Sequence, residues 1–122
     1  MKYLNTFNES IKDGPQIGDY VICDEKCCDI ESQIFTSENI GQIFDNISNR
    51  RYKYVVKYDN VPENLQQQFS NAITNFCNEE QIIKFALQKK CKWTVMSQEE
   101  VIFWSKNKED CETYLISNKY NL

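Results

Sequence analysis

The chain has 122 residues, 41% of them hydrophobic and 13% aromatic, which suits one compact domain with a modest core. Its formal net charge of −4 excludes a surface that is basic throughout, as general attraction to nucleic acid or anionic membrane would require. The chain has no histidine, which excludes most hydrolytic triads and removes the commonest neutral metal ligand.

Two absences in the sequence concern location. No stretch reaches the roughly 20 apolar residues of a membrane span, and the first residues lack the apolar region of a secretion signal. We therefore expect a cytoplasmic protein that makes no contact with membrane. Its six cysteines are expected to be reduced thiols and not a disulfide framework.

The beginning of the chain predicts a polar arm, a strand and a long loop. Residues 1–14 are weakly patterned, and Asp13-Gly14-Pro15 then predicts a turn. The β-prone residues Ile17 to Cys23 predict the first strand, where Gly18 suits the bend with which small barrels enter it. Residues 24–39 are polar and acidic and predict a long loop, the kind of segment in which recognition often resides.

The next two segments predict a hairpin. A second strand is expected from Ile40 to Ile47, with Ser48-Asn49 at the tip of the turn. A third strand is expected from Tyr52 to Asp59, because its side chains alternate in character. One face would pack or bind through Tyr52, Tyr54, Val56 and Tyr58. The other would meet water through Lys53, Val55, Lys57 and Asp59.

Two helices are predicted after the third strand. Pro62 suits a first helical turn, with Asn60 or Val61 just outside the helix. The stripe that covers the sheet consists of Leu65, Phe69, Ala72, Ile73 and Phe76. A second helix is expected from Glu79 to about Lys89, because Asn78 and Gln81 have capping-box spacing.

The last part of the chain predicts a strand and a final helix, with an ambiguous segment between them. The strand covers Trp93 to Met96, and Ser97 and Glu100 form a capping box that opens a short helical segment through Trp104. The run from Val101 to Trp104 is apolar on every side, so a buried strand that closes a barrel is the alternative. After Asn107, acidic residues favour a helix with three residues facing inward, Cys111, Tyr114 and Leu115.

Two short glycine motifs support a fold class. Gly18-Asp19-x-Val21 and Gly41-x-Ile43, followed by the alternating third strand, resemble the SH3-like barrels, including the KOW type. The wider pattern from Ile17 to Asp110 is similar to uncharacterised small proteins of phages and large DNA viruses. We therefore predict a single α+β domain over 1–122, with a small SH3-like antiparallel β-barrel. Its strands occupy 15–60, a helical insertion follows over 61–90, and the last strand and C-terminal helices occupy 91–122.

Little in the sequence predicts catalysis. Two carboxylate pairs are available, Asp24-Glu25 and Glu99-Glu100, but adjacent carboxylates usually point to different sides, so loop and helix-start roles are expected. The three glycines form no phosphate-binding loop, which argues against nucleotide hydrolysis. We predict that the protein is not an enzyme and has no cofactor.

The cysteines allow one metal hypothesis. Cys23, Cys27 and Cys28 are closely spaced and would bind zinc with a fourth thiolate, supplied by Cys77, Cys91 or Cys111. A structural zinc site usually has two paired knuckles, and this chain has one imperfect cluster. The preferred interpretation is therefore no metal, with Cys23, Cys77 and Cys111 as small core residues and the other two as loop thiols.

Basic and aromatic residues gather in two segments, a combination able to hold phosphates and stack bases. The candidate binding residues are Arg50, Arg51 and Lys53 in the first segment, Lys89, Lys90, Lys92 and Trp93 in the second, and Phe35 in the long loop as an aromatic anchor. The leading hypothesis is a non-catalytic viral-type module that binds a protein. The resemblance implies a host factor in the host cell cytoplasm, such as a defence nuclease. The alternative is a KOW-like protein that binds RNA.

Overall fold

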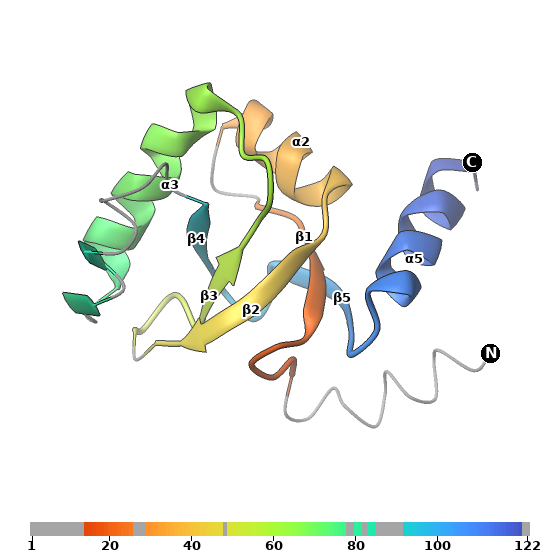
Figure 1. The fold of residues 1–122 in the computed structure, drawn as a ribbon, viewed down its shortest axis with the longest axis horizontal. Helices are drawn as coiled ribbons and strands as arrows, with labels where there is room; N and C mark the ends of the chain where they lie inside the picture. Colours follow the sequence, from red (N-terminus) through yellow and green to blue (C-terminus); the bar gives the residue numbers. More distant parts are fainter. Residues whose placement is uncertain are drawn as a thin grey trace.

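A computed structural model describes residues 14–25, 29–47, 49–77, 80–81, 83–84 and 92–120 (Figure 1). Within these ranges the predicted α+β class is confirmed, since one antiparallel sheet is combined with three helices. The elements are β1 (Tyr20–Cys23), α2 (Ile30–Glu38), β2 (Gly41–Asn46), β3 (Tyr54–Lys57), α3 (Glu63–Phe76), β4 (Trp93–Met96), β5 (Val101–Ser105) and α5 (Lys108–Tyr120). The predicted helical insertion after the third strand and the C-terminal helix are both present.

The five strands form a sheet in the order β4-β3-β2-β1-β5, with every neighbouring pair antiparallel. The pairing register shifts at Phe44 in β2 and at Ile102 in β5, where one strand carries an extra residue. Such bulges bend a strand and increase its twist. The two edge strands, β4 and β5, are not paired with each other within the described residues, so the sheet is open where the sequence predicted a barrel.

The core lies between the sheet and α3. Tyr54, Val56 and Tyr58 are almost fully buried, as predicted for one face of the third strand. The α3 stripe packs on the same cluster through Leu65, Phe69 and Ile73, with Ala72 and Phe76 at its margin. The N-cap of α3 is Pro62 itself, so this residue lies just before the first turn and not within it.

Val55 is the main exception to the predicted alternation of β3. It was expected to face water, but its exposed fraction is 0%. Val55 pairs with Val95 of β4 and belongs to the buried cluster, against which Ile83 from the segment after α3 also packs. Burial on both sides removes the alternation that a sheet with one wet face would show.

The predicted loop over residues 24–39 is wrong, because most of it forms α2. Asp29 is the N-cap, and its side chain accepts a hydrogen bond of 2.9 Å from the Ser32 backbone nitrogen. The buried residues of α2 are Ser32 and Thr36, whereas its two isoleucines are exposed. The sequence therefore shows no apolar stripe, although one face of the helix is buried.

The ambiguous run from Val101 to Trp104 forms a strand and not a helical segment, but only Val101 is buried and the strand does not close a barrel as the alternative expected. The capping box does form, with Ser97 N donating to Glu100 Oε1 at 2.9 Å and Glu100 N donating to Ser97 Oγ at 3.3 Å. It supports only one turn, because the backbone from Val101 onward pairs with β1. The predicted helix from Glu79 to Lys89 falls largely outside the described residues. The parts of it that are described, 80–81 and 83–84, are helical.

Candidate functional site

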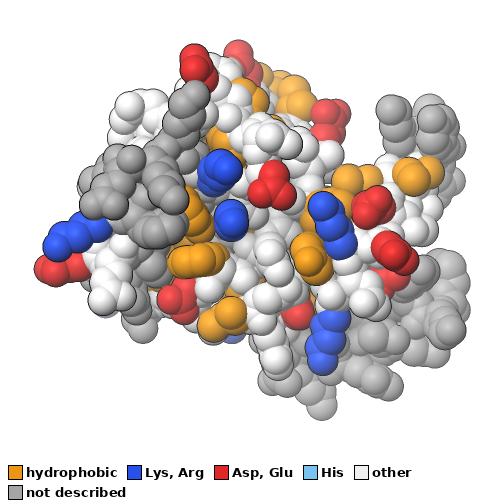
Figure 2. Space-filling view, in the orientation of Figure 1, with side chains coloured by type: hydrophobic (Ala, Val, Ile, Leu, Met, Phe, Trp, Pro, Cys, Tyr) orange, Lys and Arg blue, Asp and Glu red, His pale blue; other side chains and the backbone are white. Residues whose placement is uncertain are grey.

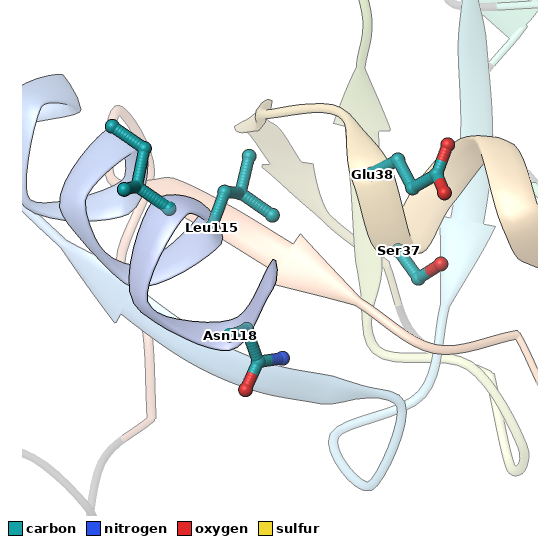
Figure 3. A pocket seen from close by; sticks show the side chains of 5 residues that line it. Ser37, Glu38, Leu115 and Asn118 are labelled. Atoms are coloured by element: carbon teal, nitrogen blue, oxygen red, sulfur yellow. The ribbon is translucent and has the colours of Figure 1, made fainter. Parts of the chain in front are cut away.

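A cleft lies between the C-terminal end of α2 and the exposed side of α5. A space of about 540 Å³ is lined by Ser37, Glu38, Leu115, Ile116 and Asn118 (Figure 3). A second space of about 350 Å³ shares Glu38 and Leu115 with it. The residues that the second space adds are Asn39, Ile40, Asp59, Asn60, Lys108 and Glu112. We call the two adjoining spaces the α2–α5 cleft.

The α5 wall of the cleft follows from how this helix is held on the sheet. Its inner side is fixed by Cys111, which is fully buried, and by Tyr114, whose ring stacks on Phe103 of β5 with centroids 4.6 Å apart. At its start, Ser105 Oγ donates to Asp110 Oδ2 at 2.5 Å. The cleft residues of α5 have helical spacing and share another side, comprising Lys108, Glu112, Leu115 and Ile116.

The α2 wall is fixed by contacts on both sides of the helix. Phe35 packs edge-on against Tyr58 of the segment after β3 and against Phe69 of α3, with centroid distances of 5.4 and 6.1 Å. Asn39 Nδ2 donates to the Phe35 carbonyl oxygen at 2.8 Å at the end of the helix. The cleft residues Ser37 and Glu38 belong to the last turn of this helix (Figure 3).

Both helices carry exposed isoleucines, of which Ile116 lines the cleft and those of α2 lie outside its lining. Ile116 is 59% exposed on α5, and on α2 Ile30 is 70% and Ile34 is 49% exposed. Ile34 precedes Ser37 and Glu38 by three and four residues, so it lies on the same side of α2 as these cleft residues. Figure 2 shows hydrophobic and acidic side chains next to one another over α5. Large apolar side chains around a hollow are typical of interaction sites.

Among the described residues that line the α2–α5 cleft, the charged side chains are mainly acidic. They are Glu38, Asp59 and Glu112, together with the basic Lys108. All four side chains are exposed. Within the described part of the chain, none of the three carboxylates makes an ion pair or accepts a side-chain hydrogen bond.

The first basic segment lies on the connection between β2 and β3. Asn49 Oδ1 accepts hydrogen bonds from the backbone nitrogens of Arg51 and Tyr52, at 2.8 and 3.1 Å, so the turn continues past the predicted tip. Ser48 itself lies outside the described residues. The structure brings the exposed side chains of Arg50, Arg51 and Lys53 together here.

The aromatic rings next to these basic side chains are buried, so the segment offers a ligand positive charge but few exposed rings. The Arg51 guanidinium lies 5.3 Å from the Tyr52 ring centre, and the Lys53 ammonium lies 5.7 Å from that of Tyr54. Tyr52 is only 8% and Tyr54 only 1% exposed. Their rings therefore present little face on which a base would stack.

The second basic segment is only partly described. Lys89 and Lys90 lie outside the described residues. Lys92 is exposed at the far end of β3 and β4 from Lys53, beside Lys57, whose ammonium lies 6.0 Å from the Trp93 ring centre. Trp93 is 5% exposed and contacts Phe44, so it is a core residue and not a stacking platform. Lys53 of the first segment and Lys92 of the second thus lie at opposite ends of β3.

Phe35, the predicted aromatic anchor, is half-buried in contacts within the protein. The hydrophobic residues that α2 exposes are Ile30 and Ile34, which the sequence analysis did not select. Their spacing of four residues, directly after the N-cap Asp29, is the signal that would have identified them as one exposed side of a helix.

The candidate catalytic carboxylates have structural roles. Glu25 is 3% exposed and its Oε1 accepts a hydrogen bond of 2.7 Å from Ser32 Oγ. Asp24 Oδ1 accepts a hydrogen bond of 2.7 Å from Gln33 Nε2. Both bonds attach α2 to the end of β1. Glu100 forms the capping box described above, and Glu99 is exposed.

The three described cysteines are core residues, as the preferred interpretation predicted: Cys23, Cys77 and Cys111 are all buried. Cys27, Cys28 and Cys91 lie outside the described residues. Among the residues that the structure does describe, no group of three side chains is suited to hold a metal ion. In that same part of the chain, no helix has the length and apolar character needed to cross a bilayer.

The buried thiols are expected to resist alkylation in the folded protein. Burial raises the pKa of Cys23, and burial followed by the nearby carboxylates of Asp110, Asp19 and Glu112 raises that of Cys111 to about 12. Because the thiolate is the reactive form, iodoacetamide at pH 8 should label both sites slowly until urea unfolds the chain. Peptide mass spectrometry measures each site separately. Equal labelling rates with and without urea would contradict this burial.

The same shift predicts the direction of pH dependence. The folded-state pKa of Cys111 lies above its usual value of 9.0, so ionisation of the thiol favours the unfolded chain. The contribution of the protonated Cys111 thiol to the free energy of unfolding is complete below pH 9 and is lost as the pH rises toward about 12.

Comparison of this chain with protein-family models, with curated proteins and with solved structures found no significant match. The α2–α5 cleft is therefore interpreted from its own residues.

Proposed function

We propose that this protein is a non-catalytic module that binds another protein in the α2–α5 cleft. The observation that carries the proposal is the exposure of Ile34 and Ile116 on two helices that border one hollow. Water in contact with such side chains is released when a partner covers them, and this release favours association. The structural use of Glu25 and Glu100 supports the non-catalytic part of the proposal.

The curvature of the sheet supports an SH3-like barrel as the scaffold of this module. In a flat sheet of this order, the edge strands would lie about 19 Å apart, which is four strand spacings. One tight turn joins them, with Glu100 N donating to the Ser97 carbonyl oxygen at 3.2 Å. Because the ends of such a turn lie within about 7 Å, the sheet has to curl. The bulges at Phe44 and Ile102 favour the same curvature.

The resemblance to small proteins of phages and large DNA viruses extends the proposal to the source of the partner. A viral module without chemistry of its own acts on its host by occupying a host protein. The partner proposed here is such a host factor, whose activity the module would block or modulate.

Affinity capture with matched variants tests the proposal. Ile116→Asp places a charge in the α2–α5 cleft. The control, Ile17→Asp, places the same charge outside the cleft, at a residue whose side chain is 58% exposed against 59% for Ile116. Quantitative mass spectrometry should find a protein that the wild type and Ile17→Asp retain and that Ile116→Asp loses at least tenfold. A protein retained equally by all three would overturn the cleft as the binding site.

Nucleic-acid binding is the second candidate function, favoured by the exposed Arg50, Arg51 and Lys53 on one connection. Counterion release predicts that affinity for RNA would fall steeply with salt. A mobility-shift titration at 50 and 200 mM salt measures this, with Arg50→Ala and Arg51→Ala as weakened variants. The absence of any shift at the lower salt concentration would eliminate this candidate.

A further inference from the structure

The α2–α5 cleft has the shape and the charge to select a particular kind of segment. We propose, on the basis of the binding function above, that it receives a short amphipathic helix of the partner, with lysine or arginine beside its apolar residues. Three properties of the cleft lead to this inference, namely its walls, its length and its charge.

The walls favour a helix over an extended segment. An extended peptide is usually bound by adding a strand to an exposed sheet edge, whose backbone groups pair with it. Most of the cleft wall is instead formed by α2 and α5, whose backbone groups bond largely within their own helices, and the other lining residues, Asn39, Ile40, Asp59 and Asn60, follow α2 and β3. An amphipathic helix needs no backbone partner and inserts its apolar side chains between such walls.

The length of the cleft sets the length of this helix. Its α5 wall extends from Lys108 to Asn118. At a rise of about 1.5 Å per residue this is about 15 Å, or nearly three helical turns. A partner helix of about ten residues would therefore present two or three apolar side chains along it, to contact Ile40, Leu115 and Ile116.

The charge of the cleft sets the sign of the flanking residues. Glu38, Asp59 and Glu112 outnumber Lys108 around the apolar side chains. Basic residues on the partner helix would lie near these carboxylates, whereas acidic residues would be repelled. A second copy of this chain is disfavoured by the same argument, because the chain carries a net charge of −4.

Designed peptides test the inference. One fluorescent twelve-residue peptide carries leucines at helical spacing and lysines on the flanks, a second has glutamates in place of the lysines, and a third has the composition of the first in scrambled order. Anisotropy should show that the first binds at least tenfold more tightly than the other two. Its affinity should also fall as the salt concentration rises.

Matched charge reversals locate the effect. Glu112→Lys changes a carboxylate of the cleft, whereas Glu109→Lys makes the same change at an exposed residue of α5 outside it. The lysine peptide should lose about tenfold in affinity for Glu112→Lys and keep its affinity for Glu109→Lys. Thermal unfolding followed by circular dichroism verifies that both variants fold.

The outcomes separate this inference from the proposed function. Equal binding of the lysine and glutamate peptides, or of the scrambled peptide, would overturn the inference. So would a dimer that sedimentation detects and Ile116→Asp disrupts. If no peptide binds but affinity capture still depends on Ile116, the basic helix is wrong and the cleft remains the binding site. If neither peptide binding nor capture depends on Ile116, both proposals fail.

Discussion

Replacing Gly41 with alanine is expected to lower the free energy of unfolding by about 3 kcal/mol, at the upper end of the usual cost of overpacking. A Cβ atom at this position would lie 2.5 Å from Val56 Cγ1 and 2.9 Å from two atoms of the Tyr58 ring. Val56 is 0% and Tyr58 is 1% exposed, so neither has space into which to move. Urea unfolding followed by fluorescence measures the change.

Gly18→Ala is the control, because the same substitution meets a different constraint there. Gly18 has a φ of 95°, and no atom lies within 4 Å of where its Cβ would be. Only the backbone conformation opposes alanine at this position, which costs about 1–2 kcal/mol. If Gly41→Ala destabilised the protein less than Gly18→Ala, this result would contradict the close approach of Gly41 to Val56 and Tyr58.

These two glycines illustrate what the sequence reveals about the fold. Both belong to the motifs that predicted the first two strands, and both strands are present. The sequence does not distinguish a glycine required by a positive φ from one required by a neighbouring side chain, because the second depends on which strand lies opposite. That information exists only once Gly41 is placed against Val56 and Tyr58.

The helices show when periodicity is informative. The stripe of α3 was predicted in full, because its buried residues are apolar and its other side is polar. The helix α2 was missed, because it buries Ser32 and Thr36 and exposes Ile30 and Ile34. An argument from periodicity assumes that apolar residues are buried, and α2 does not meet that assumption.

The candidate site was beyond sequence reasoning for a related reason. Its walls come from residues near Glu38 and near Ile116, which are far apart in the chain and become neighbours only when α5 packs on β5 and β1. Of the predicted basic residues, Arg50, Arg51 and Lys53 are exposed on the β2–β3 connection. The sequence does not identify their aromatic neighbours as core residues, since tyrosine and tryptophan occur both in protein cores and at binding interfaces.

Phe69→Ala is expected to have the largest effect on stability, with a loss of about 3–5 kcal/mol in the free energy of unfolding. The Phe69 ring is 1% exposed and lies 6.1 Å from the ring centres of both Phe35 and Tyr58. Its removal leaves a cavity where α3, α2 and the end of β3 meet. A domain of this size has about 5–15 kcal/mol of stability in total, so the variant should unfold at a much lower urea concentration.

Thr74→Ala, at an exposed residue of α3, is the control and should change the free energy of unfolding by less than about 0.5 kcal/mol. A double-mutant cycle of Phe35→Ala and Phe69→Ala then isolates the contact between the two rings, with an expected coupling of about 0.5–1.5 kcal/mol. Strictly additive losses would show that Phe35 does not rest on Phe69. Because Phe35 packs α2 on the core, that result would also remove the basis on which Ser37 and Glu38 are placed at the cleft.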